Sequence, residues 1–108
     1  LTPLLTDPSH DVRVALVASL GAAYAAVNSP DQLAQLLARA EGNAMRRLAA
    51  AAAFVMLART EAGRAAATVA LAKLAERGPT MARRTASLSL GLIKANADGI
   101  AFFTQLVP

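Results

Sequence analysis

The 108-residue chain contains no cysteine and no tryptophan, and aromatic residues make up only 4% of it. Without cysteine, neither a disulfide framework nor a thiolate metal site can form. Metal binding through other ligands needs several histidines or carboxylates that converge on one point, whereas this chain has one histidine and scattered acids. We therefore expect no metal and no cofactor.

Groups suited to catalysis are equally sparse. His10 stands beside Asp11 and close to Asp7 in the sequence, an arrangement that suggests a proton relay. A relay also needs a nucleophile that is spaced with a base and an orienting group, and no such set is present. We expect no catalytic residue, and the chain is not expected to be an enzyme.

Long apolar runs are missing too, although 56% of the residues are hydrophobic. The longest charge-free run, residues 14–30, ends in Asn28, Ser29 and Pro30, and a spanning helix requires roughly 18 to 20 strongly apolar residues. No membrane-spanning helix is expected, and the cytoplasm is the default compartment. Because Leu1 is not a start methionine, we expect the chain to be part of a longer protein.

What the chain does have is a repeated pattern. Charge-free runs begin at residues 14, 48 and 85, at intervals of 34 and 37 residues, a period typical of a solenoid of helical pairs. Each run follows arginine, and each arginine follows an acid in a turn. The acids are Asp7, Glu41 and Glu76, and the arginines after them are Arg13, then Arg46 and Arg47, then Arg83 and Arg84.

Between these runs lie segments with a polar face and helix caps. Ser29, Pro30 and Gln32 predict a capping box with proline at the first helical position, which opens a helix over residues 29–40. Further amphipathic helices are expected over residues 60–76 and 96–107. Because a helix without a polar face must be covered on several sides, the charge-free helices are expected to lie inside and the amphipathic ones outside.

The first 21 residues, LTPLLTDPSHDVRVALVASLG, resemble a HEAT repeat. That pattern has a leucine-rich helix end, Asp-Pro, a short turn, Val-Arg, and small residues leading to Leu-Gly. The matching positions are Leu4, Leu5, Asp7, Pro8, Val12, Arg13, Leu20 and Gly21, and Ala82, Arg83, Leu90 and Gly91 repeat part of them. In the middle unit two registers stay open: aligning Arg46 with Arg13 places Ala53 at the leucine position, and aligning Arg47 places Phe54 there.

The resemblance implies an all-α fold, a right-handed α-α superhelix of HEAT-like (armadillo-type) helical hairpins with about six helices. It implies one domain over residues 1–108, with repeat units near residues 1–28, 29–59 and 60–95 and a partial unit at 96–108. It also implies that the turn acids and arginines are structural. The pairs would be Asp7 with Arg13, Glu41 with Arg46, and Glu76 with Arg83, because an arginine at a helix N-terminus opposes the helix dipole unless a carboxylate or the carbonyl end of the adjoining helix receives it.

The function expected from this architecture is a protein-protein interaction scaffold. Val14, Ala18 and Leu88 fall where this family commonly has exposed polar residues, which is explained either by packing on a neighbouring helix or by an apolar groove on the concave face of the inner helices. Such a groove would take a peptide or helix of a protein partner. The candidate residues are Val14, Ala18, Ala51 and Leu88, with Arg47 and Arg84 at the rim to attract acidic partners.

Two alternatives remain. The net charge is +4, and residues 39–84 carry nine bases and three acids, so a basic rim could follow a nucleic-acid phosphate backbone, as HEAT-like glycosylases grip DNA. The chain could also be a non-catalytic part of a HEAT-like lyase or hydroxylase, since it lacks the cysteine and the His-Glu pairs of those enzymes.

The last expectation concerns the C-terminal helix. Its apolar residues are Ile100, Phe102, Phe103 and Leu106, and no charge follows Asp98. An uncapped solenoid end exposes the surface that the next repeat would bury. We therefore expect this end to be covered by more chain or by a second copy in a homodimer.

Overall fold

The structure, a computed structural model, describes residues 8–107 of the chain. It is all-α, and within those residues there is no strand. The helices are α1 (Pro8–Val27), α2 (Pro30–Arg39), α3 (Ala44–Leu57), α4 (Glu61–Arg77), α5 (Thr80–Ala95) and α6 (Gly99–Thr104). The all-helical class and the number of helices agree with the sequence-based expectation.

Local chemistry sets where several helices begin. At α2 the predicted capping box is confirmed: the backbone N–H of Gln32 donates to Ser29 Oγ at 3.3 Å, and that of Ser29 donates to Gln32 Oε1 at 2.8 Å. At α4 the N–H of Gly63 donates to Thr60 Oγ1 at 3.0 Å. These side-chain acceptors satisfy N–H groups that have no partner within their own helix.

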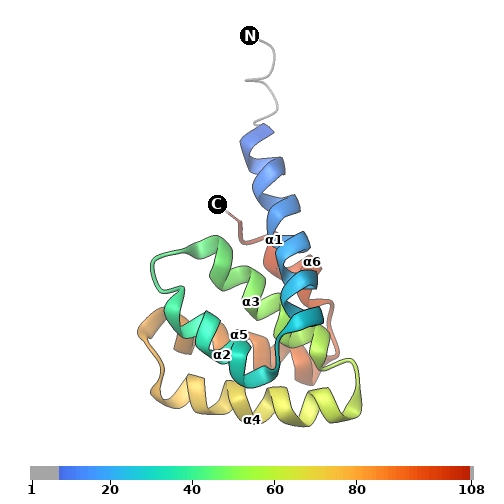
Figure 1. Ribbon diagram of the computed structural model, residues 1–108, viewed down its shortest axis with the longest axis vertical. Helices are drawn as coiled ribbons and strands as arrows, with labels where there is room; N and C mark the ends of the chain where they lie inside the picture. Colours follow the sequence, from blue (N-terminus) through green and yellow to red (C-terminus); the bar gives the residue numbers. More distant parts are fainter. Residues whose placement is uncertain (1–7, 108) are drawn as a thin grey trace.

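Helix α3 is the centre of the fold, and it contacts each of the other five helices (Figure 1). Its residues 48–55 are all buried. Five of these residues are alanines, whose small side chains let neighbouring helices approach the α3 backbone closely. Alanine is also the residue that most favours the helix. The expectation that a charge-free helix lies inside therefore holds for α3.

The same expectation is wrong for α1. This helix packs mainly on α3 and α6, and its N-terminal half projects beyond the other helices (Figure 1). Of its apolar side chains only Val17 is fully buried, while Val12 is 64% exposed and Val27 is 76% exposed. The physical reason is position: α1 lies at the edge of the bundle, so only one of its faces meets other helices.

Helix α6 does not lie on the outside of the helix stack as the repeat pattern predicts. It packs against α3 and α1, and Phe103 is buried there with its ring edge-on to Phe102 at a centroid distance of 5.2 Å. Gly99 makes this close approach possible, because a Cβ at that position would overlap the side chain of Val55 on α3. Much of the apolar C-terminal segment is therefore covered within the chain.

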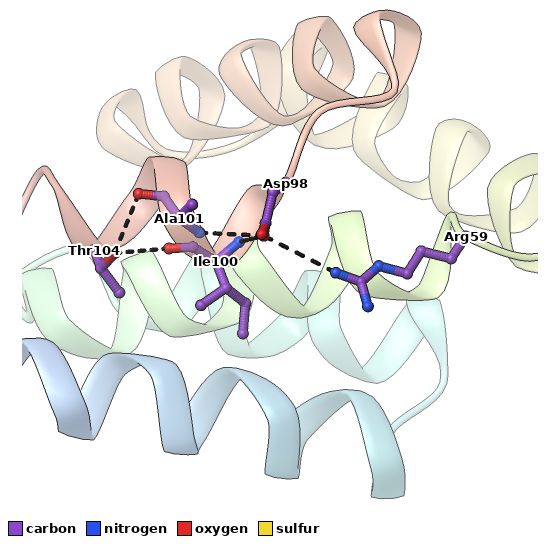
Figure 2. A network of polar contacts seen from close by, with 5 residues as sticks. All are labelled: Arg59, Asp98, Ile100, Ala101 and Thr104. Atoms are coloured by element: carbon purple, nitrogen blue, oxygen red, sulfur yellow. Dashed lines mark hydrogen bonds and ion pairs between the residues drawn. The ribbon is translucent and has the colours of Figure 1, made fainter.

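Asp98 fixes the start of α6 and connects it to the end of α3. Its Oδ1 accepts from the N–H groups of Ile100 at 3.0 Å and Ala101 at 3.2 Å. The same oxygen lies 3.9 Å from Arg59 Nη2, two residues beyond α3 (Figure 2). One turn later the Thr104 hydroxyl donates to the carbonyl of Ile100 at 2.9 Å. The bonds from Asp98 satisfy two N–H groups at the start of a helix that is only six residues long.

Candidate partner-binding groove

A groove of about 390 Å³ lies where the first turns of α3 and α5 meet the end of α6. α3 contributes one wall, α5 the other, and the C-terminal segment closes one side. The lining residues are Ala44, Arg47 and Leu48 from α3, Met81, Arg84, Thr85 and Leu88 from α5, and Phe103 and Leu106 from the C-terminal segment.

The floor of this groove is buried and its walls are open. Phe103 is fully buried and Leu48 nearly so, whereas Leu88 is 46% exposed and Leu106 is 47% exposed. These two leucines come from segments 18 residues apart in the sequence and line the same hollow. The groove therefore offers two aliphatic side chains whose exposed surface a ligand could cover.

Arg47 is held in place at the α3 wall. Its Nη1 donates to the carbonyl oxygens of Ala40 at 3.2 Å and Glu41 at 3.0 Å, just beyond the C-terminus of α2. The negative end of the α2 dipole thus receives a guanidinium that would otherwise oppose the positive N-terminus of α3. This is the role that sequence reasoning assigned to an arginine at this turn, with Arg47 rather than Arg46 filling it.

Glu41 caps a distant helix. Its two carboxylate oxygens each accept from the N–H of Met81 at 3.1 Å, and Oε1 also accepts from the N–H of Ala82 at 3.3 Å. Helix α5 begins after Pro79, which supplies no side-chain cap of its own. The carboxylate therefore fixes the start of α5, and with it Arg84, relative to the turn that holds Arg47.

The expected acid-arginine pairs differ from the contacts observed. Within residues 8–107 no ion pair joins Glu41 to Arg46 or Glu76 to Arg83. Glu41 is engaged with α5, and Glu76 Oε1 lies 3.8 Å from Nε of its neighbour Arg77, where both side chains are largely exposed. The physical reason is that backbone N–H groups at a helix start compete well for a carboxylate. Asp7 lies outside the described residues, so its pairing with Arg13 stays a prediction.

Three of the six residues predicted to bind a partner line the groove, namely Arg47, Arg84 and Leu88. The other three do not. Ala51 is completely buried in α3, and Val14 and Ala18 are partly buried on α1. Alignment of repeats placed these positions on one face, but the neighbours of α1 and α3 differ, so equivalent positions are covered in one helix and open in another.

The residues predicted for end association are also divided. Ile100 and Phe102 are partly buried and Phe103 is fully buried, so none of these side chains is fully open to a second copy. Leu106 is exposed and belongs to the groove. Sequence reasoning missed Met81 and Leu106 as groove residues because only the return of α6 onto α3 brings Leu106 beside α5.

Other surfaces have a different chemistry. A hollow of about 560 Å³ between α2 and α4 has alanines in its lining and charges of both signs, Asp31 and Glu76 with Lys73 and Arg77.

In residues 8–107 no three His, Asp or Glu side chains gather where they could hold a metal ion. His10 Nε2 lies 3.2 Å from the carbonyl oxygen of Val107, which is a contact between the two ends of the described chain.

Comparison with known proteins finds no matching family model, no matching curated protein and no matching solved structure. None of the helices in the described part of the chain is both long and apolar enough to cross a membrane.

Proposed function

We propose that this protein is a helical scaffold that binds a segment of a partner protein in the groove between α3, α5 and α6. The observation that supports this most strongly is the convergence of Leu88 and Leu106, both about half exposed, beside Arg47 and Arg84. A concave apolar surface with a few convergent polar groups is the usual form of a binding site. Binding would bury both leucines, which a folded chain otherwise leaves in water at a cost in free energy.

We also propose a HEAT-like superhelix as the plan of the fold, in a single domain. Three contacts are those that stacked helical hairpins require: α1 lies on α3, α3 on α5, and α2 on α4. In this plan α3 and α5 are inner helices, and the groove opens between their N-terminal ends. Helix α6 departs from the plan, because it returns to α3 and α1 and adds Leu106 to the groove.

An amphipathic helix is the partner segment that best suits the groove. Leu88 on α5 and Leu106 after α6 line the same groove above a buried floor, so two aliphatic side chains one helical turn apart could contact both. Recognition of this kind depends on a few apolar anchors rather than on the whole contact area. The proposal therefore predicts that a single charge at a groove leucine removes most of the binding.

Selection from a library of helical peptides displayed on phage, with the whole chain as bait, tests the proposal. We expect peptides with paired aliphatic residues to bind the natural chain and to lose at least about tenfold in affinity to Leu88→Glu or Leu106→Glu. Val69→Glu is the matched control, because Val69 on α4 is 56% exposed and lies outside the groove. Selected peptides that bind all of these variants equally well would contradict the proposal.

Nucleic-acid binding is the second candidate, and one observation favours it. Arg46, Arg83 and Arg84 are exposed near the N-termini of α3 and α5, and neither helix has an acid in its first turn. Phosphate binding would show a steep fall in affinity with rising salt. Phosphate binding would also be unchanged by the uncharged substitution Leu88→Gln, so titration of labelled duplex and single strands against this variant separates the two functions.

A further inference from the structure

We infer that the partner segment is acidic, with Asp or Glu side chains next to its apolar anchors, where it faces the N-terminal ends of α3 and α5. This inference rests on the proposed function of the groove and specifies the chemistry of its occupant. Four arginines lie near the N-termini of these two helices and are called the arginine cluster below; two of them, Arg47 and Arg84, line the groove. The four are Arg46 and Arg47 on α3, and Arg83 and Arg84 on α5.

The arginine cluster stands where positive charge is unfavourable. The N-terminus of a helix carries a partial positive charge, and acids in the first turn normally offset it. Helices α2 and α4 follow this rule with Asp31 and Glu61, whereas α3 and α5 have no acid in the first turn. A local arrangement that opposes stability is expected at functional sites rather than elsewhere.

The Glu41 carboxylate, which lies at the start of α5, forms no ion pair with the arginine cluster. The Glu41 carboxylate accepts from the N–H groups of Met81 and Ala82. In the described part of the chain, no ion pair reaches any arginine of the cluster, since those recorded there involve Arg59 and Arg77. Within residues 8–107 the cluster therefore has no carboxylate partner, and the two carbonyls beyond α2 engage one nitrogen of Arg47 only.

Arg47 is positioned to receive a carboxylate. Only its Nη1 is engaged, with the carbonyls of Ala40 and Glu41, and its Nε and Nη2 make no hydrogen bond within residues 8–107. The guanidinium is partly buried and already oriented, so a bidentate carboxylate would lose less side-chain entropy on binding than at a mobile arginine. Arg84 lines the same groove from the α5 side and provides a second cation for the same segment.

Two other surfaces of the described chain lack this combination of properties. The hollow between α2 and α4 has two acids and two bases in its lining, and the exposed face of α1 over residues 14–27 has no charge. A nucleic acid would match the arginines but would gain little from Leu88 and Leu106. Phe103, the aromatic residue of the groove, is fully buried and therefore cannot stack on a base. Positive charge and open leucines together favour an acidic, amphipathic protein segment.

Three synthetic helical peptides test the inference in fluorescence anisotropy titrations with the whole chain. Each has two leucines one turn apart, and the flanking positions are glutamate in one peptide, glutamine in the second and lysine in the third. We expect the glutamate peptide to bind about tenfold more tightly than the glutamine peptide at low salt, with the lysine peptide weakest. The difference should shrink as ionic strength rises, because exposed charges are screened.

Substitutions identify the arginines that are responsible. Arg84→Gln is expected to lower the affinity of the glutamate peptide about threefold to tenfold and to leave that of the glutamine peptide unchanged. Arg39→Gln is the matched control, because Arg39 is exposed at the end of α2 and does not line the groove. Far-UV circular dichroism of each variant establishes that it is folded.

The outcomes separate this inference from the proposed function. If the glutamate and glutamine peptides bind equally and Leu88→Glu weakens both, the groove binds partners but the inferred acidity is wrong. If none of the peptides binds, the proposed function and the inference both fall. If single-stranded or duplex nucleic acid binds with a steep salt dependence, competes with the glutamate peptide and loses affinity on Arg84→Gln but not on the uncharged substitution Leu88→Gln, the arginine cluster serves phosphate and the inference is overturned.

Discussion

Helices α1 and α3 are alike in composition and opposite in surroundings. Both contain a charge-free run rich in alanine, yet residues 48–55 of α3 are all buried, whereas α1 leaves Val12, Leu16 and Val27 exposed. α3 contacts five helices and α1 packs mainly on two. A charge-free run therefore allows a helix to be buried on every side, but the neighbouring helices decide whether it is buried.

The largest expected effect comes from placing the same charge in each helix. Ala52→Asp in α3 introduces an unpaired carboxylate at a fully buried position. We expect this substitution to lower the free energy of unfolding by roughly 4 kcal/mol or more and to prevent folding. Ala22→Asp on the exposed face of α1 is expected to cost about 1 kcal/mol or less. Thermal melting followed by circular dichroism measures both, and similar losses would contradict the contrast between the two helices.

A pair of glycine substitutions tests the close packing around α3. Gly99→Ala would place a Cβ against Val55, where α6 meets α3, and overpacking of this kind costs about 1 to 3 kcal/mol. Gly91→Ala on α5 meets nothing within 4 Å and is expected to raise stability by about 0.5 to 1 kcal/mol, because alanine favours the helix. Urea unfolding gives both values. Stabilisation by Gly99→Ala would show that α6 does not approach α3 this closely.

Glu41→Gln tests the long-range cap of α5. The variant keeps the shape of the side chain and removes its charge, so the two N–H groups of α5 lose a charge-assisted acceptor, at an expected cost of about 1 kcal/mol. Glu61→Gln is the control, since Glu61 is exposed in the first turn of α4 and is expected to change stability by about 0.5 kcal/mol or less. Equal effects of the two substitutions in urea unfolding would argue against a special role for Glu41.

The smallest effect is expected on the open face of α1. Replacing Val12 and Leu16 together by glutamine should change the free energy of unfolding by about 0.5 kcal/mol or less, because both side chains are exposed. Binding of the glutamate peptide should be unchanged as well. This expectation assumes that no second copy of the chain covers α1, and sedimentation tests that assumption. If the natural chain associates and the variant does not, a second copy covers α1.

Features decided by neighbouring residues could be predicted from the sequence. The capping box at Ser29 and Gln32 depends on groups three residues apart, and the charge-free run over residues 48–55 indicates a helix that other helices can cover on every side. Arg47 and Arg84 follow from an equally local pattern, because each is the basic residue immediately before a charge-free run.

Features decided by tertiary contacts could not be predicted in this way. The Glu41 carboxylate accepts a hydrogen bond from a backbone N–H group 40 residues away. Nothing near Glu41 in the sequence indicates that it binds this group and not a nearby arginine. The missing side-chain cap after Pro79 was the one signal that α5 needs an acceptor from elsewhere. Likewise, the turn of α6 back onto α3 depends on the space that Gly99 leaves beside Val55, and this turn brings Leu106 into the groove.

The most direct test of the account is a backbone amide chemical-shift map of the isotope-labelled chain, titrated with the glutamate peptide. The account predicts the largest changes in the first two turns of α3 and α5 and around Leu106, which together line the groove. It predicts little change along the exposed face of α1 or in the hollow between α2 and α4. Changes concentrated around Val12 and Leu16 instead would place the binding surface on the open helix and contradict the central claim.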